Sequence, residues 1–362
     1  AILARPRGSV AVLSYILRRL LLMIPTLLVV SAVTFAIIQL PPGDFVTTLM
    51  SQLEMSGEPA NLERAQSMRR EYGLDMPMWR QYTRWMGFEW VYGAHQSEAS
   101  EWFGGPKGLL QFHFGQSFKY NTPVNTLIWE RIALTVTIAL ASIIVTWIIA
   151  LPIGFYSAIR QYGFLDYSAT LFGFLGMSIP QFFFALVMLF IANRYFDISA
   201  GGLFSDEFID AAWSLAKIWD LLLHLWVPVL VLSIAGTGGT IRMMRANLLD
   251  QLEMPYVTTA RAKGLNEWWL LVKYPVRLAI NPMISTIGWM LPTLISGSVI
   301  VSIVLSLPTT GPLLYEALTS QDMFLAGSFL MILSFLTMVG TLISDILLAW
   351  VDPRIRFDSN AS

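Results

Sequence analysis

The most distinctive polar segment of the chain combines small and basic side chains in a pattern suited to contact with another protein. It runs from Tyr256 to Leu265 and reads Tyr-Val-Thr-Thr-Ala-Arg-Ala-Lys-Gly-Leu. Pro255, directly before it, suits the first turn of a helix, and Gly264 suits a helix stop. We therefore predict a short helix between these two residues.

Small side chains on this predicted helix would let a second backbone come close. Ala260 and Ala262 are expected to be exposed and to enter a groove on a partner, with Arg261 and Lys263 on its rim. The alternative is a plain surface turn that links two membrane spans, because short motifs produce false matches. The candidate contact residues are Tyr256, Thr259, Ala260, Arg261, Ala262, Lys263, Gly264 and Leu265.

Patterns for catalysis, nucleotide binding and metal binding are missing from the sequence. No Gly-x-x-x-x-Gly-Lys-Ser/Thr loop and no Gly-Lys pair occurs, so the backbone cradle and lysine that hold nucleotide phosphates are absent. There is no Gly-x-Ser-x-Gly elbow and no cysteine. His95, His113 and His224 lack metal-ligand spacing, and Glu98 and Glu101 are interpreted as solvated loop charges. We expect no enzyme activity, metal or cofactor in this chain.

The composition indicates a protein that faces lipid. Of 362 residues, 55% are hydrophobic and 13% are charged, whereas soluble domains carry about 25% charged residues. The net charge of −1 excludes a global basic field that would attract nucleic acid. We therefore predict an integral membrane protein with the lipid bilayer, and no nucleic acid, as its surroundings.

The apolar stretches predict an all-α protein with six transmembrane helices. A spanning helix needs about 20 mainly apolar residues. The fourth stretch is the weakest, because His224 and Pro228 interrupt it and it runs into the glycine-rich segment Gly236–Gly239. The first stretch could pass for a signal peptide but is interpreted as a retained span. The stretches are Leu17–Leu40, Ile132–Ala158, Thr170–Ala192, Leu221–Ala235, Ile284–Ser306 and Phe324–Val351.

The distribution of Lys and Arg predicts that both termini are cytoplasmic. Basic residues gather in the N-terminal tail, after the second and fourth stretches and in the C-terminal tail, whereas segment 307–323 has none. The predicted organisation is a cytoplasmic tail at 1–16, a first helix at 17–40, an external loop or cap at 41–130, a five-helix core at 131–351 with the contact segment near 254–270, and a cytoplasmic tail at 352–362.

Residues inside the predicted spans give weaker signals. Asp345 would be costly in the membrane, and we favour partial solvation or pairing over a functional role. Prolines in or near spans often mark bends that line a cavity; they are Pro152, Pro180, Pro228 and Pro292. We list Ser178, Pro180, Gln181 and Pro292 as candidate pathway residues. Trp85, Trp90 and Trp102 are interpreted as interfacial anchors, with a stacking patch for substrate as the alternative.

The segment ending in Gly264 resembles the cytoplasmic loop of ABC-importer permeases, whose pattern is Glu-Ala-Ala, three residues, then Gly. Ala260 and Gly264 match that pattern, and Thr258 and Thr259 replace the Glu-Ala pair, as in the oligopeptide and dipeptide branch. Further fragments resemble the first permease of peptide/nickel importers, and the likeness covers about Tyr15 to Phe357. They are Tyr15–Leu20, Pro42–Asp44, Tyr72–Pro77, Phe114–Ser117, Ser178–Pro180 and Val351–Arg354.

This resemblance implies a bacterial inner-membrane permease that forms half of a translocation pathway for peptides or peptide-like solutes. It also implies a second homologous permease, two cytoplasmic ATPase subunits that bind ATP and Mg, and an extracytoplasmic substrate-binding protein. Relatives carry nickel, opines or oligosaccharides, so these cargoes remain alternatives. A non-ATP channel or a membrane-embedded enzyme is the alternative from another class, and neither would explain the segment at Tyr256–Leu265.

Overall fold

The computed structural model describes residues 8–40, 43, 45–56, 67, 69–70, 73–88, 108–196, 201–209 and 211–351. Side chains are described from residue 16 onward, except at 51–56, 196, 289, 291–292, 296–297 and 349–351. The described residues exclude the predicted C-terminal tail, residues 1–7 of the predicted N-terminal tail, His95, Glu98, Glu101, Trp90 and Trp102. The rest of the predicted N-terminal tail, residues 8–16, is helical and begins the helix Gly8–Gln39.

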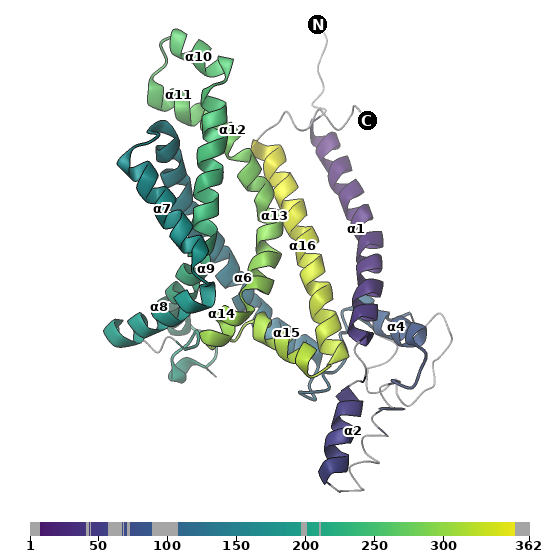
Figure 1. Cartoon of the computed structure of the whole chain (residues 1–362). Helices are drawn as coiled ribbons and strands as arrows, with labels where there is room; N and C mark the ends of the chain where they lie inside the picture. The colour runs from purple at the N-terminus through teal and green to yellow at the C-terminus, as the bar shows by residue number, and fades with distance from the viewer. Residues whose placement is uncertain are drawn as a thin grey trace. The chain divides into compact units, whose positions relative to one another are not determined.

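The described residues are helical and contain no strand; an isolated bridge joins Gln116 to Pro123. This confirms an all-α protein. The helices drawn in Figure 1 are α1 Gly8–Gln39, α2 Phe45–Ser56, α4 Met78–Met86, α6 Val124–Ile159, α7 Phe164–Ser178, α8 Gln181–Phe196, α9 Leu215–Leu252, α10 Pro255–Ala262, α11 Glu267–Lys273, α12 Pro275–Ala279, α13 Asn281–Gly297, α14 Val299–Val304, α15 Thr310–Thr319 and α16 Met323–Val351, with short 3-10 turns η2 Leu109–Gln111 and η3 Asp206–Phe208.

The chain divides into two compact units. The larger unit comprises Ala1–Leu21, Leu134–Thr309 and Leu336–Ser362, and the smaller unit comprises Leu22–Ala133 and Thr310–Phe335. Each unit has its own buried apolar clusters.

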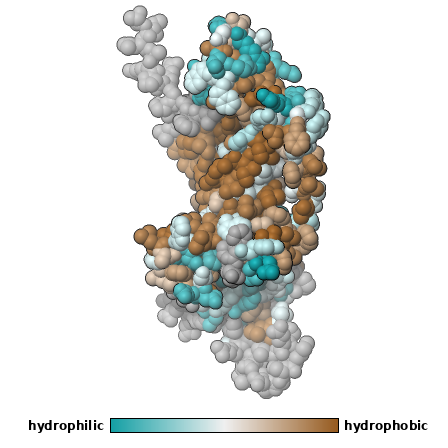
Figure 2. Space-filling view, turned by 90° about the vertical axis from the view of Figure 1, so that its left-hand side faces the viewer, coloured by the Kyte–Doolittle hydropathy of each residue, from teal (hydrophilic) through white to brown (hydrophobic). Residues whose placement is uncertain are grey.

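Among the described residues, four helices are long and apolar enough to cross a membrane. They are Ile16–Gln39, Val124–Ile159, Leu215–Leu252 and Met323–Leu348, and the pair α7 and α8 would add a fifth if it forms one span. Many large apolar side chains on these helices are exposed. On the face drawn in Figure 2, hydrophobic residues form a broad surface. A surface of this kind needs lipid or another apolar protein against it.

The predicted third span is two helices rather than one. The stretch Thr170–Ala192 breaks between α7 and α8, whose axes meet at 100°. Pro180 has no N–H to donate and disfavours a helical conformation in the residue before it. Ile179 accordingly adopts an extended conformation with ψ 125°. The proline therefore ends α7 and a new helix begins at Gln181.

Helix α9 extends beyond the predicted fourth span on both sides and continues as one helix through Gly236–Gly239. A Cβ built on Gly238 would lie 2.4 Å from the carbonyl oxygen of Gly173 on α7. The glycines therefore allow two membrane helices to cross at close range, as small residues do in lipid. Pro228 also lies inside α9 without ending it.

The predicted fifth span, Ile284–Ser306, consists of α13 with 17 residues and α14 with 6 residues. Ser298 separates them with φ −83° and ψ 0°. Gly-Ser pairs are a common place for helix kinks. Neither helix is among those long enough to span a membrane by itself.

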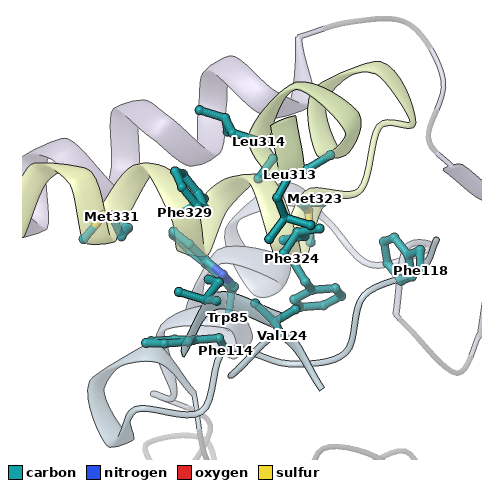
Figure 3. Packing of buried hydrophobic residues seen from close by; sticks show 14 of the residues in the cluster. Trp85, Phe114, Phe118, Val124, Leu313, Leu314, Met323, Phe324, Phe329 and Met331 are labelled. Atoms are coloured by element: carbon teal, nitrogen blue, oxygen red, sulfur yellow. The ribbon is translucent and has the colours of Figure 1, made fainter. Parts of the chain in front are cut away.

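The smaller unit has a core rich in aromatic side chains. Trp85 on α4 is 4% exposed and packs with Phe35, Phe114, Phe324 and Phe329. In Figure 3, Trp85 and Val124 lie against the helix that carries Phe329. The interpretation of Trp85 as an interfacial anchor is therefore wrong, and its burial equally excludes a stacking patch for substrate.

Asp322 fixes the start of α16 in the smaller unit. Its side chain is 0% exposed and accepts hydrogen bonds from Ser117 Oγ at 2.5 Å, the Lys119 amide at 3.2 Å and the Leu325 amide at 3.1 Å. Burial raises the pKa of this carboxyl, although these donors oppose the shift. The bond to Leu325 is a helix N-cap, so one side chain joins the 117–119 loop to α16.

Two polar groups that stood out in the sequence have protein partners. Asp345 lies 3.0 Å from Arg19 Nη2, so the ion pair links α16 to α1 within the larger unit. His224 Nδ1 lies 2.8 Å from the carbonyl oxygen of Asp220. Among the described residues, no group of His, Asp and Glu could hold a metal ion.

Candidate functional site

The helix predicted at the contact segment is present and ends where its sequence indicated. Pro255 occupies the first turn of α10, and Gly264 has a φ of +73°. The Leu265 amide donates to the Ala260 carbonyl at 3.4 Å, and the Gly264 amide donates to Arg261 at 2.9 Å. These two bonds form a Schellman cap, which needs the left-handed conformation that glycine adopts without strain.

One face of α10 is buried against the helix that follows it. Val257 and Ala260 pack with Leu270 and Leu271 of α11. Ala260 is 9% exposed, so the prediction that it projects toward a partner is wrong. Its small size serves the contact between α10 and α11, which brings the two short helices together into a compact hairpin. Phe155 of α6 is in contact with the same cluster.

The opposite face of α10 and the turn after it are exposed and, apart from Leu265, carry small or polar side chains. The exposed residues are Thr258, Thr259, Arg261, Ala262, Lys263, Gly264 and Leu265. The Thr259 hydroxyl donates to the Pro255 carbonyl at 2.9 Å, so it lies close against its own helix. Trp268 and Trp269 of α11 are exposed beside this face, at 64% and 56%. We call the exposed residues Thr258, Thr259, Arg261, Ala262, Lys263, Gly264 and Leu265 the α10 face.

Arg261 is held by an acid on α11. Its Nε lies 3.1 Å from both carboxylate oxygens of Glu267, and its Nη2 lies 2.6 Å from Oε1. The hydrogen bond from Arg261 lowers the pKa of Glu267 and raises that of the arginine. Asn266 caps α11 by accepting from the Trp268 amide at 3.0 Å. Arg261 therefore braces the hairpin, whereas no carboxylate among the described residues forms an ion pair with Lys263.

The hairpin is attached to the long helices of the larger unit. It follows α9 after a turn at Glu253 and Met254, and Trp268 makes an edge-to-face contact with Phe155, with ring centroids 5.4 Å apart. In Figure 1 the hairpin stands at one end of α9, and hydrophilic residues gather at that end of the face in Figure 2. A force on the α10 face would therefore act on α9 and α6 together.

Two charged residues lock α7 to α9 close to the hairpin. Arg245 Nε and Nη2 donate to the two oxygens of Asp166 at 2.8 and 2.9 Å. Asp166 also accepts from the Tyr162 amide at 2.9 Å. Paired arginine–carboxylate bonds of this kind are among the strongest side-chain contacts. Sequence reasoning missed this pair, and the available signal was a lone acid in the first turn of an otherwise apolar helix.

The candidate pathway residues come from two places in the larger unit. Ser178 and Pro180 flank the break between α7 and α8 and are exposed, and Gln181 begins α8. Pro292 lies in α13, and its side chain is outside the described ones. The break therefore brings together three of the four residues.

Two protein-family models match two separate parts of the chain. Residues 150–357 match the family described as binding-protein-dependent transport system inner membrane component, and residues 12–139 match the N-terminal region of such membrane components. The oligopeptide transport system permease protein AppB of Bacillus subtilis is 33% identical over 345 residues, covering 95% of this chain and 99% of the relative.

Two further relatives have similar coverage. The inner membrane ABC transporter permease protein YejB of Escherichia coli O157:H7 is 30% identical over 370 residues, covering 95% of this chain and 99% of the relative. The peptidoglycan transport system permease protein YejB of Agrobacterium fabrum is 28% identical over 365 residues, covering 95% and 98%.

Proposed function

The chain belongs to the family of binding-protein-dependent transport system inner membrane components, and from this we propose that it is one of two permease subunits of an ATP-driven peptide importer. Two relatives with near-complete coverage are named for oligopeptide and peptidoglycan transport, and this supports a peptide-containing cargo. The chain itself carries no nucleotide-binding loop. ATP is therefore hydrolysed by separate subunits.

The observation that carries the mechanism is the hairpin of α10 and α11. Its inner face is filled by Val257, Ala260, Leu270 and Leu271, while its outer face holds small and polar residues. A short helix whose exposed side chains are mostly small can fit a groove on another protein. We propose that an ATPase subunit receives the α10 face and that its closure is transmitted through the hairpin to α9.

The proposed arrangement in the membrane has six crossings. They are α1, α6, the broken pair α7–α8, α9, the broken pair α13–α14 and α16, with both termini in the cytoplasm. The Lys and Arg distribution supports a cytoplasmic location for the hairpin. A substrate-binding protein would deliver cargo to the opposite face, and a homologous permease would complete the pathway.

Alternating access follows from this arrangement. Broken helices line cavities in transporters, because backbone groups freed at the break are tolerated only where protein or water surrounds them. The break at Ser178–Pro180 supports a place for the pathway beside α7. The pair Asp166–Arg245 would keep α7 and α9 moving as one body when the hairpin is displaced.

The test is reconstitution of the complete complex in liposomes. The permease pair, the ATPases and the binding protein, taken from the same gene neighbourhood, should take up a labelled tripeptide only when ATP is supplied to the ATPase side. Uptake without ATP would contradict the coupling. ATP-dependent uptake of nickel or an oligosaccharide, with no peptide uptake, would replace the proposed cargo.

A further inference from the structure

A small cavity in the larger unit lies where α13 ends and α14 begins. It is lined by residues of α6, α9, α13 and α14, by Ser298 at the break between α13 and α14, and by Thr309 beyond α14. Its volume of about 10 Å³ suits a single water molecule. The lining residues are Thr135, Ile138, Ala139, Leu232, Leu294, Ser298, Ser302 and Thr309.

Half of these lining residues carry a hydroxyl group, although the surroundings are apolar. Ile138, Leu232 and Leu294 belong to a buried apolar cluster. Burying a hydroxyl group without a hydrogen bond costs free energy, so a gathering of hydroxyls at one small cavity indicates a polar occupant. The exposed fractions are 4% for Thr135, 6% for Ser298, 1% for Ser302 and 3% for Thr309.

Thr309 is the residue of this cavity whose hydrogen bonding is incomplete. Its Oγ1 is buried and has no hydrogen-bond partner among the described residues. The backbone that carries it is held in a turn, because the Thr309 amide donates to the Leu307 carbonyl at 2.8 Å and the Leu307 amide donates to the Ser302 carbonyl at 2.8 Å. The hydroxyl is therefore fixed at the cavity wall and needs a partner that the described residues do not supply.

The hydroxyl of Ser298 can complete the other side of the site. Ser298 Oγ donates to the Ile295 carbonyl at 3.2 Å, which uses its hydrogen and leaves the oxygen able to accept. The hydroxyl of Thr309 can donate or accept. Buried water molecules typically make about three hydrogen bonds to such groups, so one water molecule can bridge the two hydroxyls.

The lining favours water over a metal ion and over a dry cavity. Calcium and magnesium ions need carboxylate and carbonyl oxygens, and no carboxylate lines this cavity. Cavities that stay dry are apolar, whereas a dry cavity here would leave the hydroxyl of Thr309 with an uncompensated desolvation cost. A water molecule satisfies this hydroxyl and adds no charge to the interior.

We propose that this cavity holds a structural water molecule that joins Thr309 Oγ1 to Ser298 at the break between α13 and α14. Ordered water is one of the means by which interrupted membrane helices keep their polar groups satisfied. The water fastens the segment after α14 to the break, and so helps to hold the bent form of the predicted fifth span. This inference goes beyond the proposed function, because it depends on neither the cargo nor the ATPase.

Replacing Thr309 by valine separates a hydrated cavity from a dry one by the sign of the effect. With water present, Thr309→Val loses a hydrogen bond, so we expect the thermal midpoint of the protein purified in nanodiscs to fall by about 2 °C. In a dry cavity the same change removes an unpartnered hydroxyl, and the midpoint would rise. Thr319→Val makes the same chemical change at an exposed threonine of α15 and serves as the control. A rise, or a fall no larger than in the control, would overturn the proposal.

A high-resolution electron cryo-microscopy map gives a second test that needs no variant. In a map that resolves ordered water elsewhere, we expect a density peak about 3 Å or less from Thr309 Oγ1, at hydrogen-bond distance. A cavity without density in such a map would overturn the proposal. A peak too close to its oxygens for hydrogen bonds would identify a cation and would overturn it as well. Neither test uses peptide or ATP, so failure of the proposed function would leave this result unaffected.

Discussion

Gly264 offers a graded test of how the turn after α10 is built. Its φ of +73° is left-handed, and a Cβ built there meets no atom within 4 Å. In the chain alone, a side chain at this position therefore costs only backbone strain. That strain is about 1–2 kcal/mol for an L-residue, and Asn is among the residues that tolerate it best. We expect Gly264→Asn to be milder than Gly264→Ala, and Gly264→Val to be the most damaging.

The strain becomes measurable as weaker binding of the ATPase subunit. Relaxing the turn would displace Leu265, whose amide closes the cap on Ala260. If docking requires the capped turn, 1–2 kcal/mol corresponds to about 5- to 30-fold weaker binding for Gly264→Ala. The assay is titration of purified ATPase subunit onto the permease pair in nanodiscs, with membrane abundance as the control for folding. An order that follows side-chain volume, with Ala milder than Asn, would refute the conformational argument.

Three other perturbations test the rest of the account. Asp166→Ala should destabilise the purified complex by about 3 kcal/mol. This is the lower end of the range for breaking a buried ion pair, chosen because the Arg245 side chain is 27% exposed. An unchanged thermal midpoint would contradict this expectation. Burial raises the pKa of Asp322 above its unfolded value, so its contribution to stability is greatest below the unfolded pKa and declines as pH rises through the folded pKa. Asp322→Asn should remove that decline, and identical pH profiles would refute it. The purified chain alone should hydrolyse no ATP above background, since it lacks a phosphate-binding loop; turnover in a preparation free of other subunits would show otherwise.

The bounds of α10 could be predicted because the residues that start and stop this helix act locally. Pro255 and Gly264 act on their own backbone, so their effects depend little on the rest of the fold. The burial of Ala260 could not be read in the same way. It depends on Leu270 and Leu271, which return to α10 only because α11 folds back against it.

Hydropathy located the apolar stretches but could not describe how the helices bend or cross. The window that covers Thr170–Ala192 has the same composition whether Pro180 bends the chain slightly or, as here, by 100°. Gly236–Gly239 resembled a helix end, and α9 continues there because Gly238 meets Gly173 of another helix. The pair Asp166–Arg245 likewise depends on that crossing, which the sequence by itself does not place.

The central claim is that the α10 face contacts an ATPase subunit, and cysteine cross-linking tests it directly. The chain has no cysteine, so Ala262→Cys places a single thiol on the exposed side of α10. Thr319→Cys provides an exposed control on α15, in a segment expected to face the other side of the membrane. In the active complex, a short thiol-to-amine reagent should join Ala262→Cys to the ATPase subunit and should not join Thr319→Cys to it. Transport-competent complexes that give no ATPase adduct from Ala262→Cys, or from the neighbouring Thr258→Cys, would contradict the account.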